Sequence, residues 1–148
     1  LLQALRLAGW QGWRVLHEPM VWVLQAAYAW LPVGLALKCI ALTQGAAASA
    51  FWLHALTVGT MATMILGVMS RTALSHTGRP MRVGVSSTAA YVLLLLAALV
   101  RVFGLAVPGF DYVAVIVLSA AFWSGAFALF LFEYGPMLWR PRIDGREG

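Results

Sequence analysis

Three histidines are the side chains in this sequence best suited to binding a metal ion or a haem. His54 lies inside an apolar stretch, and His76 lies further along in a basic, turn-forming segment, TALSHTGRP. Neutral imidazole is the commonest protein ligand for metals and a standard axial ligand of haem iron. An ionisable residue inside a membrane span is a functional candidate by default. The alternative for His54 is a structural histidine, hydrogen-bonded at the membrane interface.

His54 and His76 would lie far apart if one continuous helix carried both residues. A continuous α-helix would place them about 33 Å apart, at roughly 1.5 Å per residue. They could not bind one metal within a single copy of the chain, so two ligands would mean two sites on opposite membrane faces. The alternative for His76 is a helix-terminal residue near exposed carbonyl groups, because Gly78 and Pro80 follow in the order expected at a helix end.

His17 and Met61 are weaker candidates for metal binding. His17 precedes the first apolar span and could approach His76 across the same face, with Glu18 orienting its ring. The alternative is an interfacial histidine beside an acid. Met61 shares a helical stripe with His54, but methionines at this spacing more often fill cores than bind metals. No carboxylate pair has a spacing that suggests acid–base catalysis, and the sequence leaves open whether the chain is an enzyme.

The elements that must position these residues are membrane spans. The chain has 148 residues, 62% hydrophobic and 10% charged, with a mean hydropathy of +0.85. A soluble domain is nearer about 45–50% apolar and about 25% charged. A helical span needs about 20 mostly apolar residues, and the segments that qualify are 21–42, 49–70, 86–106 and 112–134. The sequence therefore predicts one all-α membrane domain over 1–148, a bundle of four transmembrane helices with an amphipathic N-terminal segment.

Basic residues predict the orientation of these spans. Arginines occur in the N-terminal region, in the 71–85 loop and in the tail, whereas the 43–48 and 107–111 connections carry no Lys or Arg. By the positive-inside rule, both termini are cytoplasmic. The net charge of +5 then reflects topology rather than nucleic-acid binding, and the bilayer is the expected partner. Lys38 and Arg101, near the outer helix ends, are expected to snorkel outward.

Two further features concern helix packing. Small residues recur every four positions along the second span, at Ala55, Gly59, Thr63 and Gly67. This spacing lets a neighbouring helix approach closely, so it predicts a helix–helix contact. Pro32 is expected to kink the first span near its middle.

Several segments of the sequence resemble the C-terminal part of the NnrS family, from about position 17 to the end. They are WVLQAAYAWLP, HALTVG, SRTALSHTGRP and the tail YGPMLWRPRIDGREG. The family comprises bacterial multi-span membrane proteins described as binding haem and copper and as protecting against nitric oxide and nitrosative stress. The resemblance implies the last third of a longer protein in the bacterial inner membrane. It also implies that His54 of HALTVG and His76 of HTGRP are ligands, since they match recurrent family histidines.

One position departs from the family pattern. Many members carry a histidine before AYAWLP, where this chain has Gln25. If that histidine is a ligand, an amide oxygen is a poor substitute on haem iron, which puts full haem loading in doubt.

Two other functions stay open on the sequence alone. One is a cofactor-free transporter or channel segment in which His54 lines a polar path, and the other is a structural module of a larger membrane bundle. Against a path, the polar residues look scattered over several helices; they are Gln25, Thr57, Thr60, Thr63, Ser119 and Ser124. Missing ligands would come from other helices of the full-length protein or from further copies of the chain.

Overall fold

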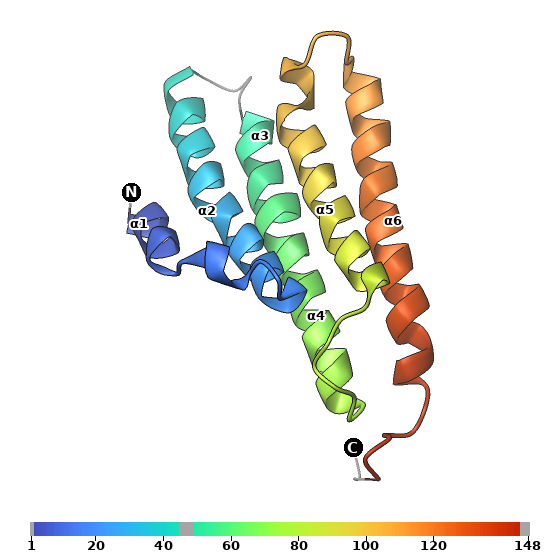
Figure 1. Ribbon diagram of the computed structural model, residues 1–148. Coiled ribbons are helices and arrows are strands. Elements are labelled where there is room, and N and C mark those ends of the chain that lie inside the picture. Colours follow the sequence, from blue (N-terminus) through green and yellow to red (C-terminus); the bar gives the residue numbers. More distant parts are fainter. Residues whose placement is uncertain (1, 45–48, 146–148) are drawn as a thin grey trace.

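The computed structural model describes residues 2–44 and 49–145, and the regular elements in these ranges are all helices. In chain order they are α1 (Leu2–Gly9), η1 (Gly12–Val15), α2 (Pro19–Gln44), α3 (Ser49–His54), η3 (Ala55–Ala62), α4 (Thr63–His76), α5 (Val85–Phe103), η4 (Gly104–Ala106) and α6 (Tyr112–Leu138). Segments α3, η3 and α4 form one continuous helix (Figure 1).

In the part of the chain that the structure describes, four helices are long and apolar enough to cross a membrane, which confirms the predicted all-α membrane fold. They cover Pro19–Thr43, Ala50–His76, Val85–Ala106 and Tyr112–Leu138. Two of these helices extend beyond the predicted spans. The second continues past position 70 to His76 and ends before Gly78 and Pro80, where the sequence also indicated a helix end. The fourth continues through Pro136 to Leu138.

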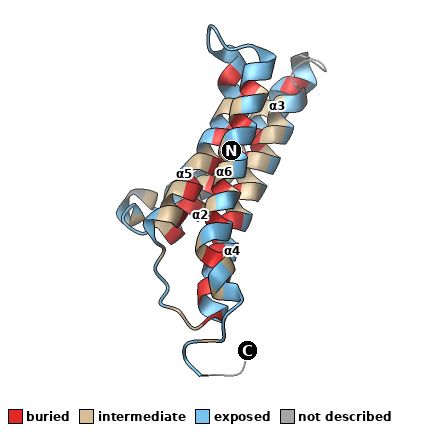
Figure 2. Ribbon diagram, turned by 90° about the vertical axis from the view of Figure 1, so that its right-hand side faces the viewer, coloured by how far each residue is buried: buried red, intermediate tan, exposed pale blue. Residues whose placement is uncertain are grey.

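The spanning helices form a layer in sequence order, α2, then α3–η3–α4, then α5 and α6 (Figure 1). Helix α5 packs along α6, and α2 packs along the second helix. Seen edge-on in Figure 2, the layer is narrow, and buried residues alternate with exposed ones along each helix. Large apolar side chains on the outer surfaces, such as Leu131 and Phe132 of α6, suit contact with lipid or with further helices.

The small-residue stripe of the second helix forms the predicted contact. Its four members, Ala55, Gly59, Thr63 and Gly67, are all buried. Gly59 faces the Trp30 ring of α2 so closely that a Cβ at Gly59 would lie 2.5 Å from a ring carbon. Gly67 faces Val23 in the same way, with its hypothetical Cβ 3.0 Å from a methyl carbon. Small side chains here let α2 approach along the whole contact. Helix α2 itself continues through Pro32 without ending there.

The N-terminal segment lies against α2. The Tyr28 hydroxyl donates a hydrogen bond to Gln3 Oε1, and the Trp10 ring lies 4.6 Å from the Tyr28 ring, centroid to centroid. Gln25 covers Gly12, where a Cβ would lie 2.5 Å from Gln25 Oε1. The amphipathic segment is therefore docked on the bundle through polar and aromatic contacts.

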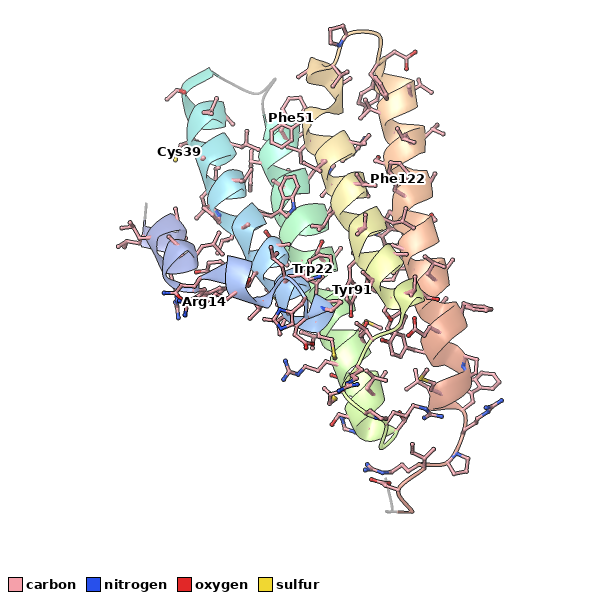
Figure 3. The ribbon with its side chains drawn as sticks, viewed as in Figure 1. Arg14, Trp22, Cys39, Phe51, Tyr91 and Phe122 are labelled. Atoms are coloured by element: carbon pink, nitrogen blue, oxygen red, sulfur yellow. The ribbon has the colours of Figure 1, made fainter. Side chains whose placement is uncertain are left out.

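A set of hydroxyl-bearing residues fills the interior where α4, α5 and α6 meet. We call Ser70, Ser87, Tyr91 and Tyr134 the closed cluster. The Ser87 and Tyr134 hydroxyls share a hydrogen bond of 2.7 Å, and Ser70 Oγ donates to the Leu66 carbonyl at 2.9 Å. The Tyr91 ring meets Trp22 edge-on at 6.0 Å (Figure 3). These groups join three helices through buried contacts.

Candidate functional site

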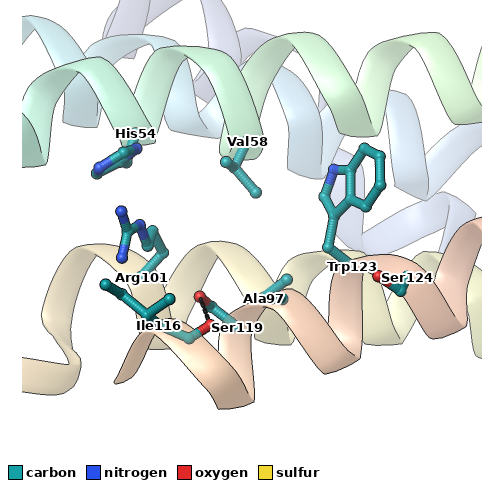
Figure 4. A pocket seen from close by; sticks show the side chains of 9 residues that line it. His54, Val58, Ala97, Arg101, Ile116, Ser119, Trp123 and Ser124 are labelled. Atoms are coloured by element: carbon teal, nitrogen blue, oxygen red, sulfur yellow. Dashed lines mark hydrogen bonds between the residues drawn. The ribbon is translucent and has the colours of Figure 1, made fainter. Parts of the chain in front are cut away.

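A largely apolar pocket that also holds several polar side chains opens between the second helix, α5 and α6, towards the end of the layer that holds the 107–111 turn. Its volume is about 310 Å³, and Figure 4 shows its walls. The lining residues are His54, Val58, Ala97, Arg101, Ile116, Ser119, Ala120, Trp123 and Ser124. We call this the His54 pocket. It lies within the segments that are able to span a membrane.

Two basic side chains lie on opposite walls of the His54 pocket. His54 is the last residue of α3 and Arg101 comes from the last turn of α5, and their side chains point toward one another (Figure 4). Both are half-buried. Among the described residues, no carboxylate lies within ion-pair distance of Arg101. The pocket therefore combines an imidazole, a guanidinium and hydroxyl groups without an opposing negative charge.

A wider helical turn separates Met61 from His54. The eight residues of η3 form a π-helix, in which backbone hydrogen bonds span five residues. The Thr60 and Thr63 hydroxyls follow this spacing, donating to the carbonyls of Ala55 at 3.4 Å and Val58 at 3.3 Å. Each residue of a π-helix turns less than one of an α-helix. Met61 consequently rotates away from the His54 face and is 57% exposed, so the structure does not bring these two residues together.

The HTGRP segment ends α4 with a Schellman motif. Gly78 N donates to the Ser75 carbonyl at 3.2 Å, and Arg79 N donates to the Leu74 carbonyl at 2.9 Å. Gly78 has φ +70°, a conformation that glycine adopts at little cost. The glycine and the proline of this signature therefore have a structural explanation, which does not extend to the His76 ring.

The C-terminal tail covers the end of α4. Ile143 N donates to the Thr77 carbonyl at 3.3 Å, and a Cβ on Gly78 would lie 2.8 Å from the Asp144 carboxyl carbon. Arg142 Nε and Nη2 donate to the two Asp144 oxygens at 2.9 and 2.6 Å. This hydrogen bonding raises the pKa of the Arg142 guanidinium. The tail and the α4 terminus thus form one folded corner.

His76 and His17 lie apart from the His54 pocket. His76 is exposed on the last turn of α4 and borders an apolar pocket with Met69 and Phe130. His17 is also exposed, just before α2. Within residues 2–44 and 49–145, no group of three or more His, Cys, Asp or Glu side chains is placed to hold a metal ion. The described chain alone does not build the shallow site that His17, Glu18 and His76 could have formed.

The donor atoms of the His54 pocket suit haem better than copper. A haem iron can be held by a single protein imidazole, as in globins and peroxidases. Copper sites use several histidine, cysteine or methionine donors, and this pocket has one imidazole plus a guanidinium, which has no lone pair to give. A haem at this pocket would be held by the one imidazole of His54, and a copper site would need ligands from outside this pocket.

The sequence did not indicate that three members of the pocket lie together. Arg101, which was expected to snorkel outward from the end of its span, has its side chain beside His54 (Figure 4). Ser119 and Ser124 looked scattered, yet both line the His54 pocket. No sequence pattern could have joined them, because their meeting depends on how α5 and α6 pack against the second helix. Gln25 contacts Gly12 and is not part of this pocket.

The fold and the pocket define an integral membrane helical protein with ionisable side chains facing a cavity between its spans. The chain belongs to the NnrS protein family, whose sequence model matches residues 1–142. The match begins before position 17, so it includes α1 and η1 as well as the spans. No curated protein and no solved structure was found to match the chain.

Proposed function

We propose that this chain is part of a haem- and copper-binding protein of the bacterial inner membrane that protects against nitric oxide and nitrosative stress. His54 is the axial haem ligand in this proposal. The observation that carries it is the placement of the His54 imidazole, half-buried on the wall of a largely apolar pocket between spanning helices. Family membership supplies the expectation of haem and copper.

The physical chemistry of the pocket supports a ligand role for His54. Ionisable groups inside membrane spans are costly and are usually retained for function. Among the described residues, none forms a hydrogen bond with the His54 ring, so a ring nitrogen is free to bind a metal. When bound, haem supplies an iron centre that can bind diatomic molecules such as nitric oxide.

His76 is the proposed second ligand position, for copper. It lies at the other end of the same long helix, and a metal there would need ligands from other helices of the full-length protein or from a second copy. With both termini cytoplasmic, as the positive-inside rule predicts, His76 faces the cytoplasm and the His54 pocket lies towards the outer surface.

The test is a visible spectrum with metal analysis of the detergent-purified protein, oxidised and then reduced, for the wild type, His54→Ala and His76→Ala. His17→Ala is the matched control, because His17 is exposed and outside the pocket. We expect the Soret band to be lost in His54→Ala and kept in the control. Copper content should fall in His76→Ala alone.

Two outcomes would contradict the proposal. Full pigmentation of His54→Ala would remove His54 as the haem ligand. A colourless, metal-free wild type, repeated with the full-length protein, would favour a cofactor-free transporter or channel segment, or a structural module.

A further inference from the structure

We propose that Arg101 makes the His54 pocket a binding site for a small monovalent anion, a carboxylate or an inorganic oxyanion. The guanidinium of Arg101 and the imidazole of His54 face each other at one end of the pocket, and the side chain of Trp123 lines the other end (Figure 4). Its lining includes no carboxylate. The inference concerns charge and does not depend on which metal or haem the protein holds.

The charge of Arg101 needs a counter-charge or water, because its side chain faces a pocket between segments that are able to span a membrane. An ionised group inside a membrane span is costly, and such groups pair with opposite charges or face water-filled cavities. A guanidinium stays protonated in proteins, so Arg101 cannot avoid this cost by losing its proton.

The acidic residues near the ends of the spans are engaged elsewhere. Asp111 Oδ1 accepts a hydrogen bond from Ala114 N at 2.7 Å, which caps α6. Glu133 Oε1 accepts from Gly84 N at the other end of α5, and Asp144 pairs with Arg142. Within the described ranges, an acidic partner for Arg101 is therefore lacking. An anion brought from outside the chain would supply the missing charge.

The lining also offers donors that an anion can use. A guanidinium presents several N–H groups in a planar fork that matches the two oxygens of a carboxylate. The Trp123 indole is a pure donor, and neutral imidazole carries one N–H. A volume of about 310 Å³ is at the small end for ligand pockets and exceeds the needs of a small carboxylate.

The same anionic chemistry could come from two sources. One is a free anion from solution, and the other is a carboxylate carried by the cofactor, since haem bears propionate groups. The second source rests on the proposed haem function, whereas the first does not. The experiment is therefore divided into a cofactor-free arm and a haem arm.

The cofactor-free arm uses azide as a small monovalent probe whose infrared stretching band reports its surroundings. The purified protein is prepared without haem or copper and titrated with azide, followed by displacement with formate. We expect a bound-azide band in the wild type and at least about tenfold weaker binding in Arg101→Gln, because that substitution removes a charge-assisted contact.

Lys38→Gln is the matched control. Lys38 is a cation near the same end of the layer, but its Nζ lies 4.8 Å over the Trp52 ring, outside the His54 pocket. Ser124→Leu provides a second variant, which fills the pocket without removing a charge. The proposal predicts that azide binding survives in Lys38→Gln and is lost in Ser124→Leu. Equal azide binding in all variants would overturn the proposal. It would also be overturned if the wild type bound no azide and the haem comparison described next showed no dependence on Arg101.

The haem arm compares haem with its dimethyl ester, in which both propionates are neutral. If the cofactor carboxylate is the anion, Arg101→Gln weakens the binding of haem by about tenfold and leaves the ester unchanged. If the anion is free, the two haems respond alike to the substitution and azide binding still depends on Arg101. Arg101-dependent azide binding without any haem binding would disprove the proposed function and leave the anion site standing.

Discussion

The closed cluster and the His54 pocket lie at different levels of the same three-helix region, and they differ in how their polar groups are packed. Every member of the closed cluster is at most 2% exposed. Neutral hydroxyl groups there are surrounded by aromatic rings, including Trp22 and Phe130. The His54 pocket instead leaves a cavity and places its imidazole and guanidinium on the walls. Side chains of the protein fill the closed cluster, whereas the His54 pocket has space for a ligand.

Charge explains this difference. A neutral hydroxyl can be closed inside a bundle at modest cost once a neighbour accepts its hydrogen, as Ser87 and Tyr134 do for each other at 2.7 Å. The Tyr91 hydroxyl is buried without a hydrogen-bond partner among the described residues, a cost of about 1–3 kcal/mol that packing can offset. A guanidinium requires a counter-charge or water, so helices cannot simply close over Arg101. Polar groups in the closed cluster are therefore read as structural, and those of the pocket as functional.

The largest expected effect comes from emptying the closed cluster. Tyr134→Ala removes a ring that is 0% exposed and leaves a cavity where α4, α5 and α6 meet. We expect a loss of about 3 kcal/mol in unfolding free energy, the low end for truncating a buried aromatic, because lipid rather than water is the alternative solvent. The measurement is reversible unfolding in mixed detergent micelles, followed by tryptophan fluorescence.

Trp123→Ala is the matched control, because it truncates an aromatic on the same helix beside the open pocket. Trp123 is 43% exposed, so its loss should cost less than about 1 kcal/mol. Equal losses in the two variants would show that the His54 pocket is packed as tightly as the closed cluster, and the contrast between them would fail.

The next expected effect comes from adding volume at two positions of α6. Ala126→Leu places extra methylene groups in a fully buried position beside the closed cluster, and overpacking should cost about 1–3 kcal/mol. Ser124→Leu adds similar bulk facing the His54 pocket, where space exists, and should change stability by less than about 0.5 kcal/mol. The same unfolding titration measures both.

Ligand binding provides a second comparison of these two variants. Ser124→Leu should fold normally yet lose pocket ligands, whereas Ala126→Leu, where it folds, should keep them. A destabilised Ser124→Leu with unchanged ligand binding would reverse the roles assigned to the two regions.

The sequence was sufficient for the fold because membrane helices follow from length and hydropathy. Four apolar segments predicted the spans, and the small-residue stripe predicted a close helix–helix contact, which α2 makes at Gly59. The second helix extends past the predicted span 49–70 to His76, and its end lies before Gly78 and Pro80, as their order in the sequence indicated. The His54 ligand hypothesis came from one residue in an apolar run and is still a prediction.

The partners of His54 could not be predicted, for two physical reasons. The π-helix η3 changes which residues share a face with His54, and the α-helical spacing used for Met61 assumes that no such turn occurs. Arg101 and Ser119 reach the pocket only through the packing of α5 and α6. Hydropathy gives each span but not the rotation of one span about its axis relative to the next.

The smallest effect tests whether the hydroxyl groups of the closed cluster matter beyond filling space. A double-mutant cycle with Ser87→Ala and Tyr134→Phe isolates the hydrogen bond of 2.7 Å between them. We expect a coupling of about 0.6 kcal/mol, the average for hydrogen bonds between membrane helices. Pairing Ser124→Ala with Tyr134→Phe gives the reference cycle, since Ser124 lines the other region and should show no coupling. A coupling indistinguishable from zero for Ser87 as well would mean that ring packing alone holds this region together. The charge of Arg101 in the His54 pocket would still call for a ligand or counter-ion, because a guanidinium cannot be neutralised by packing.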